Sequence, residues 1–281
     1  MSTIGRIINA TVITPGLRID GATIVIEDDV IAEVLPPGTP MPEADWTFDA
    51  KGDYVAPGFF DIHAHGAVGY EVTDDDPNSV PAVCKAKLEE GVTSYFPTTL
   101  TLGHDALVNT MERVAKYRET EEFCRTPGVH LEGPFINPTS LGAQNPAYVR
   151  TPDIKEVLDL AAIAPISQMS YAVETEGGID FAQQLLENGV VPSCGHSKST
   201  YAESGSTINY ALAPKISEHL HQMLPDATVG GAANRLSSHI LMEIIQETLL
   251  KTGLRCRSDF QGCQQSHKMS PVSYTHLTLP T

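Results

Sequence analysis

The chain has 281 residues, of which 41% are hydrophobic, and a formal net charge of −17. This length is enough for one large domain with a smaller one attached, and the composition fits a soluble globular protein. The acidic charge argues against nucleic acid as a partner, because phosphates need a basic surface. No apolar run approaches the ~20 residues that would cross a bilayer, so we expect no membrane span.

The cysteines and the N-terminus together predict the compartment. The first segment, MSTIGRIINATVITPG, has no basic stretch followed by a continuous apolar core, so we expect no signal peptide. The five cysteines are scattered, odd in number and without metal-type pairing: Cys84, Cys124, Cys194, Cys256 and Cys263. This usage is typical of a reducing compartment, and we expect a cytoplasmic protein.

Residues 1–55 predict a small β domain. Segments 7–16, 22–29 and 30–38 alternate or cluster β-branched residues between Gly, Pro and Asp turns, as short strands do. Residues 36–42 predict a loop, and residues 49–58 lead into the next element.

From Val55 the pattern changes to strands that alternate with helices, which favours parallel βα units. Residues 56–235 are therefore predicted to form an α/β barrel or an open α/β sheet. Six strands are expected, at 58–66, 92–100, 128–135, 168–174, 190–197 and 215–222. Helices are expected at 79–91, 105–119, 153–164 and 178–189. An eight-stranded barrel would need two strands more.

Residues 236–281 are predicted to be an aberrant or non-native tail. Segment 239–253 can form an amphipathic helix, but the residues after it show neither periodicity nor a barrel-like strand. Their content of Cys, Gln, Ser and Thr also departs from that of the preceding chain. We expect truncation, a frameshift or vector read-through, which sequencing of the locus beyond codon 235 would test.

The stretch GFFDIHAHGAVGY places His63 and His65 at the end of an apolar run. Side chains two residues apart share one face of a strand, so both imidazoles can converge on one metal ion. They can equally be the polar end of an ordinary strand. Asp61 lies on the same face and can orient or share the site.

Other polar residues also lie at predicted strand ends. Glu132 ends a strand and is a metal ligand or a solvated residue at the rim of the site, whereas His130 is expected to have a hydrogen-bonded core role. His196 follows the fifth strand, and of His219 and His221 only one is expected to face inward. The remaining histidines contribute nothing: His104 is expected to be exposed or near a helix cap, and His239, His267 and His276 lie in the tail.

Together these residues form the kind of set that a hydrolytic site with one or two divalent metals requires. The segments GDYVAPGFFDIHAHG, HLEGPFINPTSLGAQNP, SCGHS and EHLHQM resemble the N-acetylglucosamine-6-phosphate deacetylases of the amidohydrolase superfamily. The resemblance covers roughly residues 1–233, and the segment HLEGPF…GAQNP is its most specific part.

The resemblance implies a (β/α)8 TIM-like barrel, here incomplete at the C-terminus, with a small β-sandwich built from both chain ends. It implies hydrolysis of N-acetylglucosamine 6-phosphate to glucosamine 6-phosphate and acetate, in amino-sugar catabolism, by a homodimer. The metal, which can be Zn, Fe, Mn or Co, would be held by Glu132, His196 and His219, with a second ion at His63 and His65. The implied substrate contacts are Ala143, Gln144, Gln222 and Met223.

The sequence departs from this family in three places, and these departures predict a poorly folded or inactive chain. No residue matches the arginine that grips the substrate phosphate, and the Asp-Gly-x-His segment is missing after EII. The strand-eight aspartate that would act as general base and acid has no counterpart, because Asp259 is not a credible substitute. General acid–base assistance is worth about 10²–10⁴-fold in rate.

Three other hypotheses remain open. The chain can be another amidohydrolase, acting on a cyclic amide or a different N-acyl sugar, and only the GAQNP loop separates this from the deacetylase. It can be a non-catalytic metal-binding remnant, which would bind metal without turnover. It can also be an artefact without a cellular role.

Overall fold

The computed structural model describes residues 2–14, 16–200, 202–204 and 275–277. The chain divides into two compact units, one containing Met1–Phe59 and the other beginning at Phe60. None of the helices in the described part of the chain is both long and apolar enough to span a membrane.

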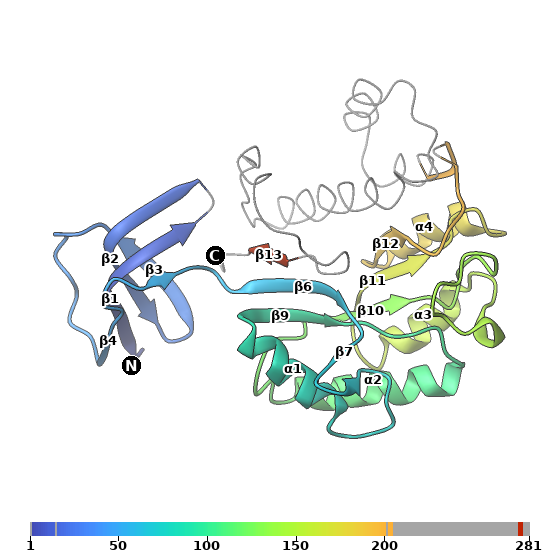
Figure 1. The fold of residues 1–281 in the computed structure, drawn as a ribbon, viewed down its shortest axis with the longest axis horizontal. Coiled ribbons are helices and arrows are strands. Elements are labelled where there is room, and N and C mark those ends of the chain that lie inside the picture. Colours follow the sequence, from blue (N-terminus) through green and yellow to red (C-terminus); the bar gives the residue numbers. More distant parts are fainter. Residues whose placement is uncertain (1, 15, 201, 205–274, 278–281) are drawn as a thin grey trace. The chain divides into compact units, whose positions relative to one another are not determined.

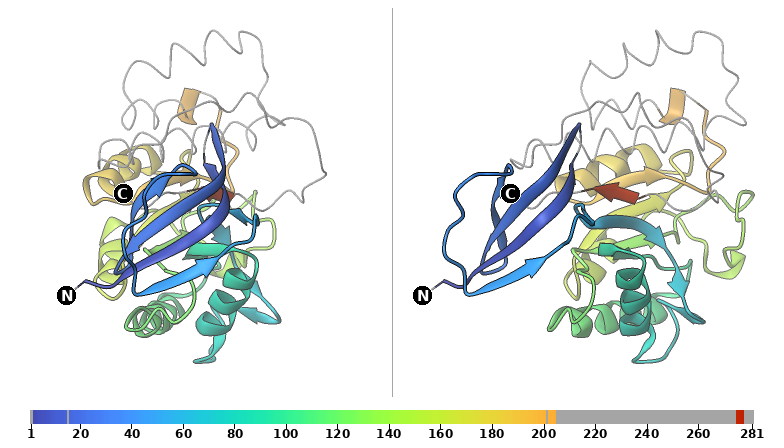
Figure 2. Two further views of the ribbon diagram at one scale, coloured as in Figure 1. Left: turned by 90° about the vertical axis from the view of Figure 1, so that its left-hand side faces the viewer. Right: turned by 60° about the vertical axis from the view of Figure 1, so that its left-hand side comes forward.

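The N-terminal unit is one twisted β-sheet (Figures 1 and 2). Its strands are β1 (Ile4–Thr14), β2 (Leu17–Glu27), β3 (Val30–Leu35), β4 (Trp46–Asp49) and β5 (Tyr54–Val55). The order is β3-β2-β1-β4, with β5 also paired to β1. β2 runs antiparallel to both β1 and β3, whereas β4 and β5 run parallel to β1.

The three strands predicted in this region are confirmed, and two were missed. β4 and β5 have four and two residues, too few for a clear alternation pattern, and they depend on pairing with β1. One face of the sheet buries a small apolar core of Ala10, Val12, Ala22, Ile24 and Ala50. Strands β1 to β5 form a single sheet, so they do not include the second layer of the expected sandwich.

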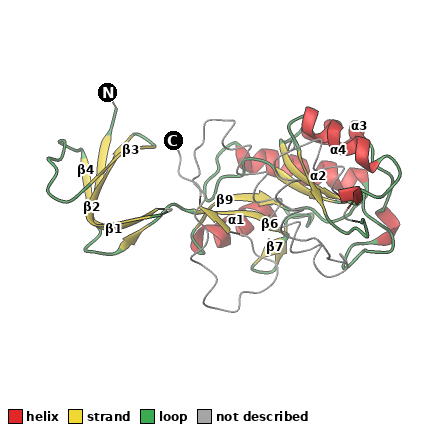
Figure 3. Cartoon of the chain, turned by 90° about the horizontal axis from the view of Figure 1, so that it is seen from above, coloured by secondary structure: helices red, strands yellow, loops and turns green. Residues whose placement is uncertain are grey.

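The second unit alternates strands with helices, and among the described residues the α-helices occur only here (Figure 3). In chain order its main elements are β6 (Phe59–Ala64), α1 (Ser79–Glu89), β9 (Val92–Pro97), α2 (His104–Arg118), β10 (Val129–Glu132), α3 (Ile154–Ala161), β11 (Ile166–Tyr171), α4 (Gly178–Glu187) and β12 (Val191–Cys194). Five of the six predicted strands and all four predicted helices are therefore confirmed. The sixth predicted strand, 215–222, lies outside the described residues.

Three short strands and one short 3-10 helix were not predicted. β7 (Gly66–Ala67) and β8 (Tyr70–Glu71) form an antiparallel pair after β6, and the 3-10 helix spans Pro146–Tyr148. β13 (Thr275–Leu277) lies beside β6 in the sheet order β13-β6-β9. β13 falls in the segment where no strand was expected. The sequence pattern could not reveal it, because an edge strand offers free backbone groups that can pair with any extended segment.

The central strands form a parallel arrangement that brings polar side chains together. β10, β11 and β12 pair in parallel. Two isolated parallel bridges add to this: Ser94 in β9 pairs with Arg125, ahead of β10, and Thr98, directly after β9, pairs with His130 in β10. In such sheets the residues that follow each strand's C-terminal end gather on one side, where α/β proteins build their sites.

The helices hold this sheet through apolar contacts. α2 presents Leu107, Met111 and Val114 at helical spacing, and all three are fully buried. Around α4 and β11, Phe181 packs edge-on against Phe135 and Tyr171, with ring centroids 5.3 Å and 5.2 Å apart. These residues belong to the large apolar core of the second unit.

Candidate metal centre

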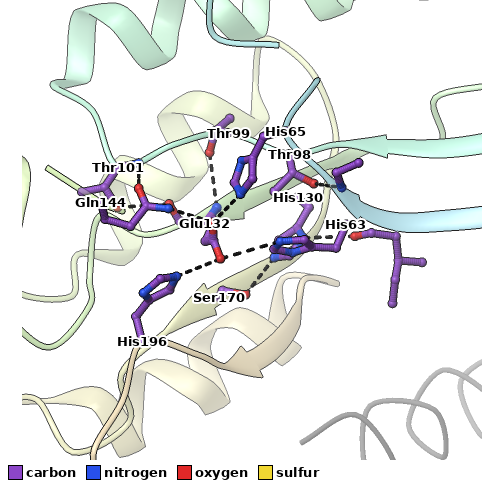
Figure 4. A network of polar contacts seen from close by, with 12 residues as sticks. His63, His65, Thr98, Thr99, Thr101, His130, Glu132, Gln144, Ser170 and His196 are labelled. Atoms are coloured by element: carbon purple, nitrogen blue, oxygen red, sulfur yellow. Dashed lines mark hydrogen bonds and ion pairs between the residues drawn. The ribbon is translucent and has the colours of Figure 1, made fainter. Parts of the chain in front are cut away.

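Four residues predicted as metal ligands converge at the ends of three strands (Figure 4). His63 lies near the end of β6 and His65 is the first residue after it. Glu132 is the last residue of β10, and His196 follows β12. The shared-face argument for His63 and His65 is confirmed, because both imidazoles face the same carboxylate. His219, the remaining predicted ligand, lies outside the described residues.

The Glu132 carboxylate lies at the centre of this cluster. Its Oε2 lies 2.8 Å from His65 Nε2, and its Oε1 lies 2.9 Å from His196 Nε2 and 3.9 Å from His63 Nε2. One ligand atom each from His63, His65 and Glu132 lies within 4.8 Å of the others, which is close enough to share one metal ion. All four side chains are largely buried, with 9–29% of each side chain exposed.

The charges of these groups fit a cation. Burial alone would raise the pKa of Glu132, but hydrogen bonds from His196 and His65 lower it below its ordinary value, so the carboxylate is ionised. Burial lowers the pKa of His63, which keeps that imidazole neutral, whereas the hydrogen bond to Glu132 raises the pKa of His196. An imidazole nitrogen that faces a carboxylate has two options. It can carry a proton and donate it to the carboxylate, or it can use its lone pair to bind a cation that lies between the two groups. The donor set of imidazole nitrogens and one carboxylate suits Zn²⁺, Fe²⁺, Mn²⁺ or Co²⁺.

Gln144 is buried and orients the central carboxylate. Its Nε2 donates to Glu132 Oε2 at 2.8 Å, and its Oε1 accepts from the backbone N–H of Thr101 at 2.7 Å. Because the Thr101 N–H needs an acceptor, the amide oxygen of Gln144 faces Thr101 and its NH₂ group faces Glu132. Its predicted neighbour in the substrate pocket, Ala143, is exposed, whereas the two other predicted substrate contacts, Gln222 and Met223, lie outside the described residues.

Threonines after β9 were not singled out from the sequence. Thr99 Oγ1 accepts from the Glu132 backbone N–H at 3.3 Å, and Thr101 Oγ1 donates to the Glu132 carbonyl at 3.3 Å. Both are fully buried. The signal was present as the polar run TTLT after an apolar strand, a position where parallel sheets place functional side chains.

Two nearby residues serve the fold rather than the ligand set. The core role expected for His130 is confirmed, because its ring nitrogens contact the Ile62 carbonyl at 3.0 Å and Ser170 Oγ at 2.8 Å. Burial lowers the pKa of His130 to about 3, so it is neutral. Asp61 does not share the site: it pairs with Lys87 at 3.1 Å and accepts from the His63 backbone N–H at 3.0 Å.

His104 is exposed at the first turn of α2, as predicted from its loop position. Its Nδ1 lies 3.1 Å from Glu156, outside the centre. Asp259, which the sequence did not support as a substitute base, lies outside the described residues.

Comparisons with known proteins confirm the resemblance. No family model matches the chain. It is 28% identical over 181 residues to an N-acetylglucosamine-6-phosphate deacetylase of Lysinibacillus sphaericus, covering 63% of this chain and 46% of that protein. It is 29% identical over 189 residues to an N-acetylgalactosamine-6-phosphate deacetylase of Escherichia coli O157:H7, covering 66% of this chain and 48% of that protein. The chain thus spans about half the length of these relatives.

Solved structures show the same fold. A mutant N-acetyl-D-glucosamine-6-phosphate deacetylase from Mycobacterium smegmatis, in complex with N-acetyl-D-glucosamine-6-phosphate, matches with a TM-score of 0.64 and 24% identity, over 74% of this chain and 53% of that one. The N-acetylglucosamine-6-phosphate deacetylase from Pasteurella multocida matches with a TM-score of 0.66 and 23% identity, over 74% and 54%. At this identity the likeness establishes the fold alone.

Proposed function

We propose that the chain is part of a metal-dependent deacetylase that hydrolyses the N-acetyl group of N-acetylglucosamine 6-phosphate, releasing acetate and glucosamine 6-phosphate. The observation that carries the proposal is the convergence of His63, His65 and His196 on the Glu132 carboxylate. This arrangement occurs in a chain whose curated relatives are hexosamine-6-phosphate deacetylases.

The metal would be held by Glu132, His196 and His219, with His63 and His65 available for a second ion. A divalent cation bound there would supply Lewis-acid activation of water and of the substrate's amide carbonyl. Gln144 and the backbone N–H of Thr101 keep the Glu132 carboxylate in one orientation, which limits the rearrangement needed for binding.

The described part of the chain supplies no aspartate for proton transfer at the centre. Asp61 is the acidic residue nearest to His63 in the chain, but its carboxylate is engaged with Lys87 and a backbone N–H. Because the sequence also has no counterpart of the family's strand-eight aspartate, we expect this chain to bind metal yet to turn over substrate about 10²–10⁴-fold more slowly than an enzyme with a positioned general base.

The remaining features of the family are part of the same proposal. The alternating strands and helices of the second unit would belong to a (β/α)8 barrel, and the N-terminal sheet to a small β-sandwich. The complete protein would be a cytoplasmic homodimer in which Ala143, Gln144, Gln222 and Met223 contact the amino sugar.

A second candidate substrate is N-acetylgalactosamine 6-phosphate, because one relative is a deacetylase of that sugar. The two sugars differ only in the configuration at C4, so they present the same acetamide group to the metal centre. Comparing acetate release from both substrates would separate the two activities.

The test begins with purified 281-residue protein, stripped of metal and then loaded with Zn²⁺, Fe²⁺, Mn²⁺ or Co²⁺. We expect stoichiometric metal and slow acetate release in the unmodified chain, and loss of both in Glu132→Gln and His196→Asn. Glu156→Gln is the matched control, because Glu156 is also a hydrogen-bonded carboxylate but lies outside the centre.

Metal bound without any acetate release would instead support the metal-binding remnant. Equal metal content in Glu132→Gln and the unmodified chain would refute the assignment of the centre.

A further inference from the structure

Glu174 lies three residues beyond β11 and accepts three short hydrogen bonds. Asn137 Nδ2 donates to Oε1 at 2.7 Å, the backbone N–H of Lys198 donates to Oε1 at 2.6 Å, and Ser197 Oγ donates to Oε2 at 2.6 Å. A carboxylate that accepts several hydrogen bonds holds its donors strongly, because each bond is charge-assisted.

The donors come from two loops, and each loop carries a residue of the metal centre. Asn137 lies five residues after Glu132, in the loop that follows β10. Ser197 and Lys198 immediately follow His196 in the loop after β12. Glu174 therefore connects the two loops without reaching the centre itself.

Further contacts tie the same loops together around His196. The Asn137 backbone N–H donates to the His196 carbonyl at 3.0 Å, and His196 Nδ1 lies 3.2 Å from the Ser140 carbonyl. Ser140 Oγ donates to the Ser197 carbonyl at 3.4 Å. The imidazole is thus held on one side by the loop after β10, with its Nε2 facing Glu132.

The backbone of His196 needs such support. Its φ of +50° lies in the left-handed region, which residues with a side chain rarely adopt. A conformation of this kind persists only where surrounding contacts determine it. The two hydrogen bonds from Ser197 and Lys198 to Glu174 are among the contacts that fix the chain directly after His196.

We propose that Glu174 is a positioning residue: its carboxylate holds the His196 turn against the loop after β10, so that His196 Nε2 is aimed at the metal centre. The proposal rests on the assignment of His196 as a ligand under the proposed function. Partners that orient metal ligands from outside typically change metal affinity 10–100-fold.

The test uses the full-length chain with Glu174→Gln, which keeps the size of the side chain but removes its charge and one acceptor oxygen. Glu176→Gln is the matched control, because Glu176 is exposed in the same loop. Hydrogen–deuterium exchange of the metal-free proteins is followed in peptides that contain residues 137–140 and 195–198. We expect at least about tenfold faster exchange there in Glu174→Gln, with β10 and β11 unchanged.

The second readout is Co²⁺ binding, followed by the visible absorption of the bound ion. We expect about 10–100-fold weaker binding and an altered spectrum in Glu174→Gln, and no change in Glu176→Gln. Unchanged exchange around His196, or acceleration throughout the sheet, would overturn the proposal. Local acceleration with an unaltered Co²⁺ spectrum and affinity would also overturn it. If the unmodified chain binds no Co²⁺, the proposed function fails, while the exchange comparison still decides whether Glu174 holds the turn.

Discussion

The buried ion pair between Lys87 and Asp61 offers a quantitative test of how the second unit is held together. Lys87 Nζ lies 3.1 Å from Asp61 Oδ2, and the two residues are 8% and 5% exposed. The pair joins α1 to β6, the strand that carries His63. Burial alone would lower the pKa of Lys87, but Asp61 raises it above its ordinary value, so the lysine is charged.

The cost of replacing Lys87 by Met follows from this geometry. Two unit charges 3.1 Å apart attract by about 5 kcal/mol at an effective dielectric constant near 20. Most of that attraction offsets the desolvation of the two groups, but removal of one partner leaves the other charge buried and uncompensated. We therefore expect Lys87→Met to lower the free energy of unfolding by about 3–5 kcal/mol.

Urea denaturation followed by far-ultraviolet circular dichroism is the assay, because the described α-helices all lie in the second unit. Lys85→Met is the matched control, since Lys85 lies on the same helix but is exposed; its cost should stay within about 0.5 kcal/mol. The double variant Lys87→Met with Asp61→Asn should recover most of the loss, because it leaves no unpaired charge. Equal urea midpoints for Lys87→Met and Lys85→Met would refute the reasoning.

Three further predictions concern the core, a salt bridge and the centre. Phe181→Ala removes a ring that is 2% exposed between two other aromatic rings, and should cost about 3–5 kcal/mol in urea denaturation, whereas Phe181→Leu should cost less. Burial alone would raise the pKa of Glu156, but Arg150 lowers it below its ordinary value of 4.5. The stability that ionised Glu156 contributes is therefore complete above pH 4.5 and is lost as the pH falls through its lower pKa in the folded state. Glu156→Gln should lower the free energy of unfolding by roughly 1.5–3 kcal/mol at pH 7 and by progressively less toward pH 3. A difference in stability that stays constant with pH would contradict this. Gln144→Leu removes the amide donor to Glu132 and should weaken Co²⁺ binding about 10–100-fold in a spectroscopic titration. It also removes the acceptor of the buried Thr101 N–H, so the urea midpoint should fall. Unchanged Co²⁺ affinity would mean that Gln144 does not orient the carboxylate.

The elements of the second unit could be predicted from the sequence because they depend on local pattern. Apolar residues at helical spacing, as in α2, and short apolar runs that end in polar residues, as in β6 and β10, are visible in a single segment. The same logic placed His63, His65, Glu132 and His196 at strand ends, and the structure brings these side chains together. β4 and β5 escaped prediction because such short strands depend on a partner strand distant in the chain.

What only the tertiary structure decided is the pairing of polar groups across the sheet. From the sequence, Asp61 was a candidate for the metal centre, yet Lys87 on a neighbouring helix engages its carboxylate. Gln144 was predicted as a substrate contact, and only the structure shows that its amide also bridges Thr101 and Glu132. Glu174 carried no sequence signal at all, because its three donors lie 37, 23 and 24 residues away. Local periodicity determines which face a side chain occupies; its hydrogen-bond partner is determined by which strands and loops the fold makes neighbours.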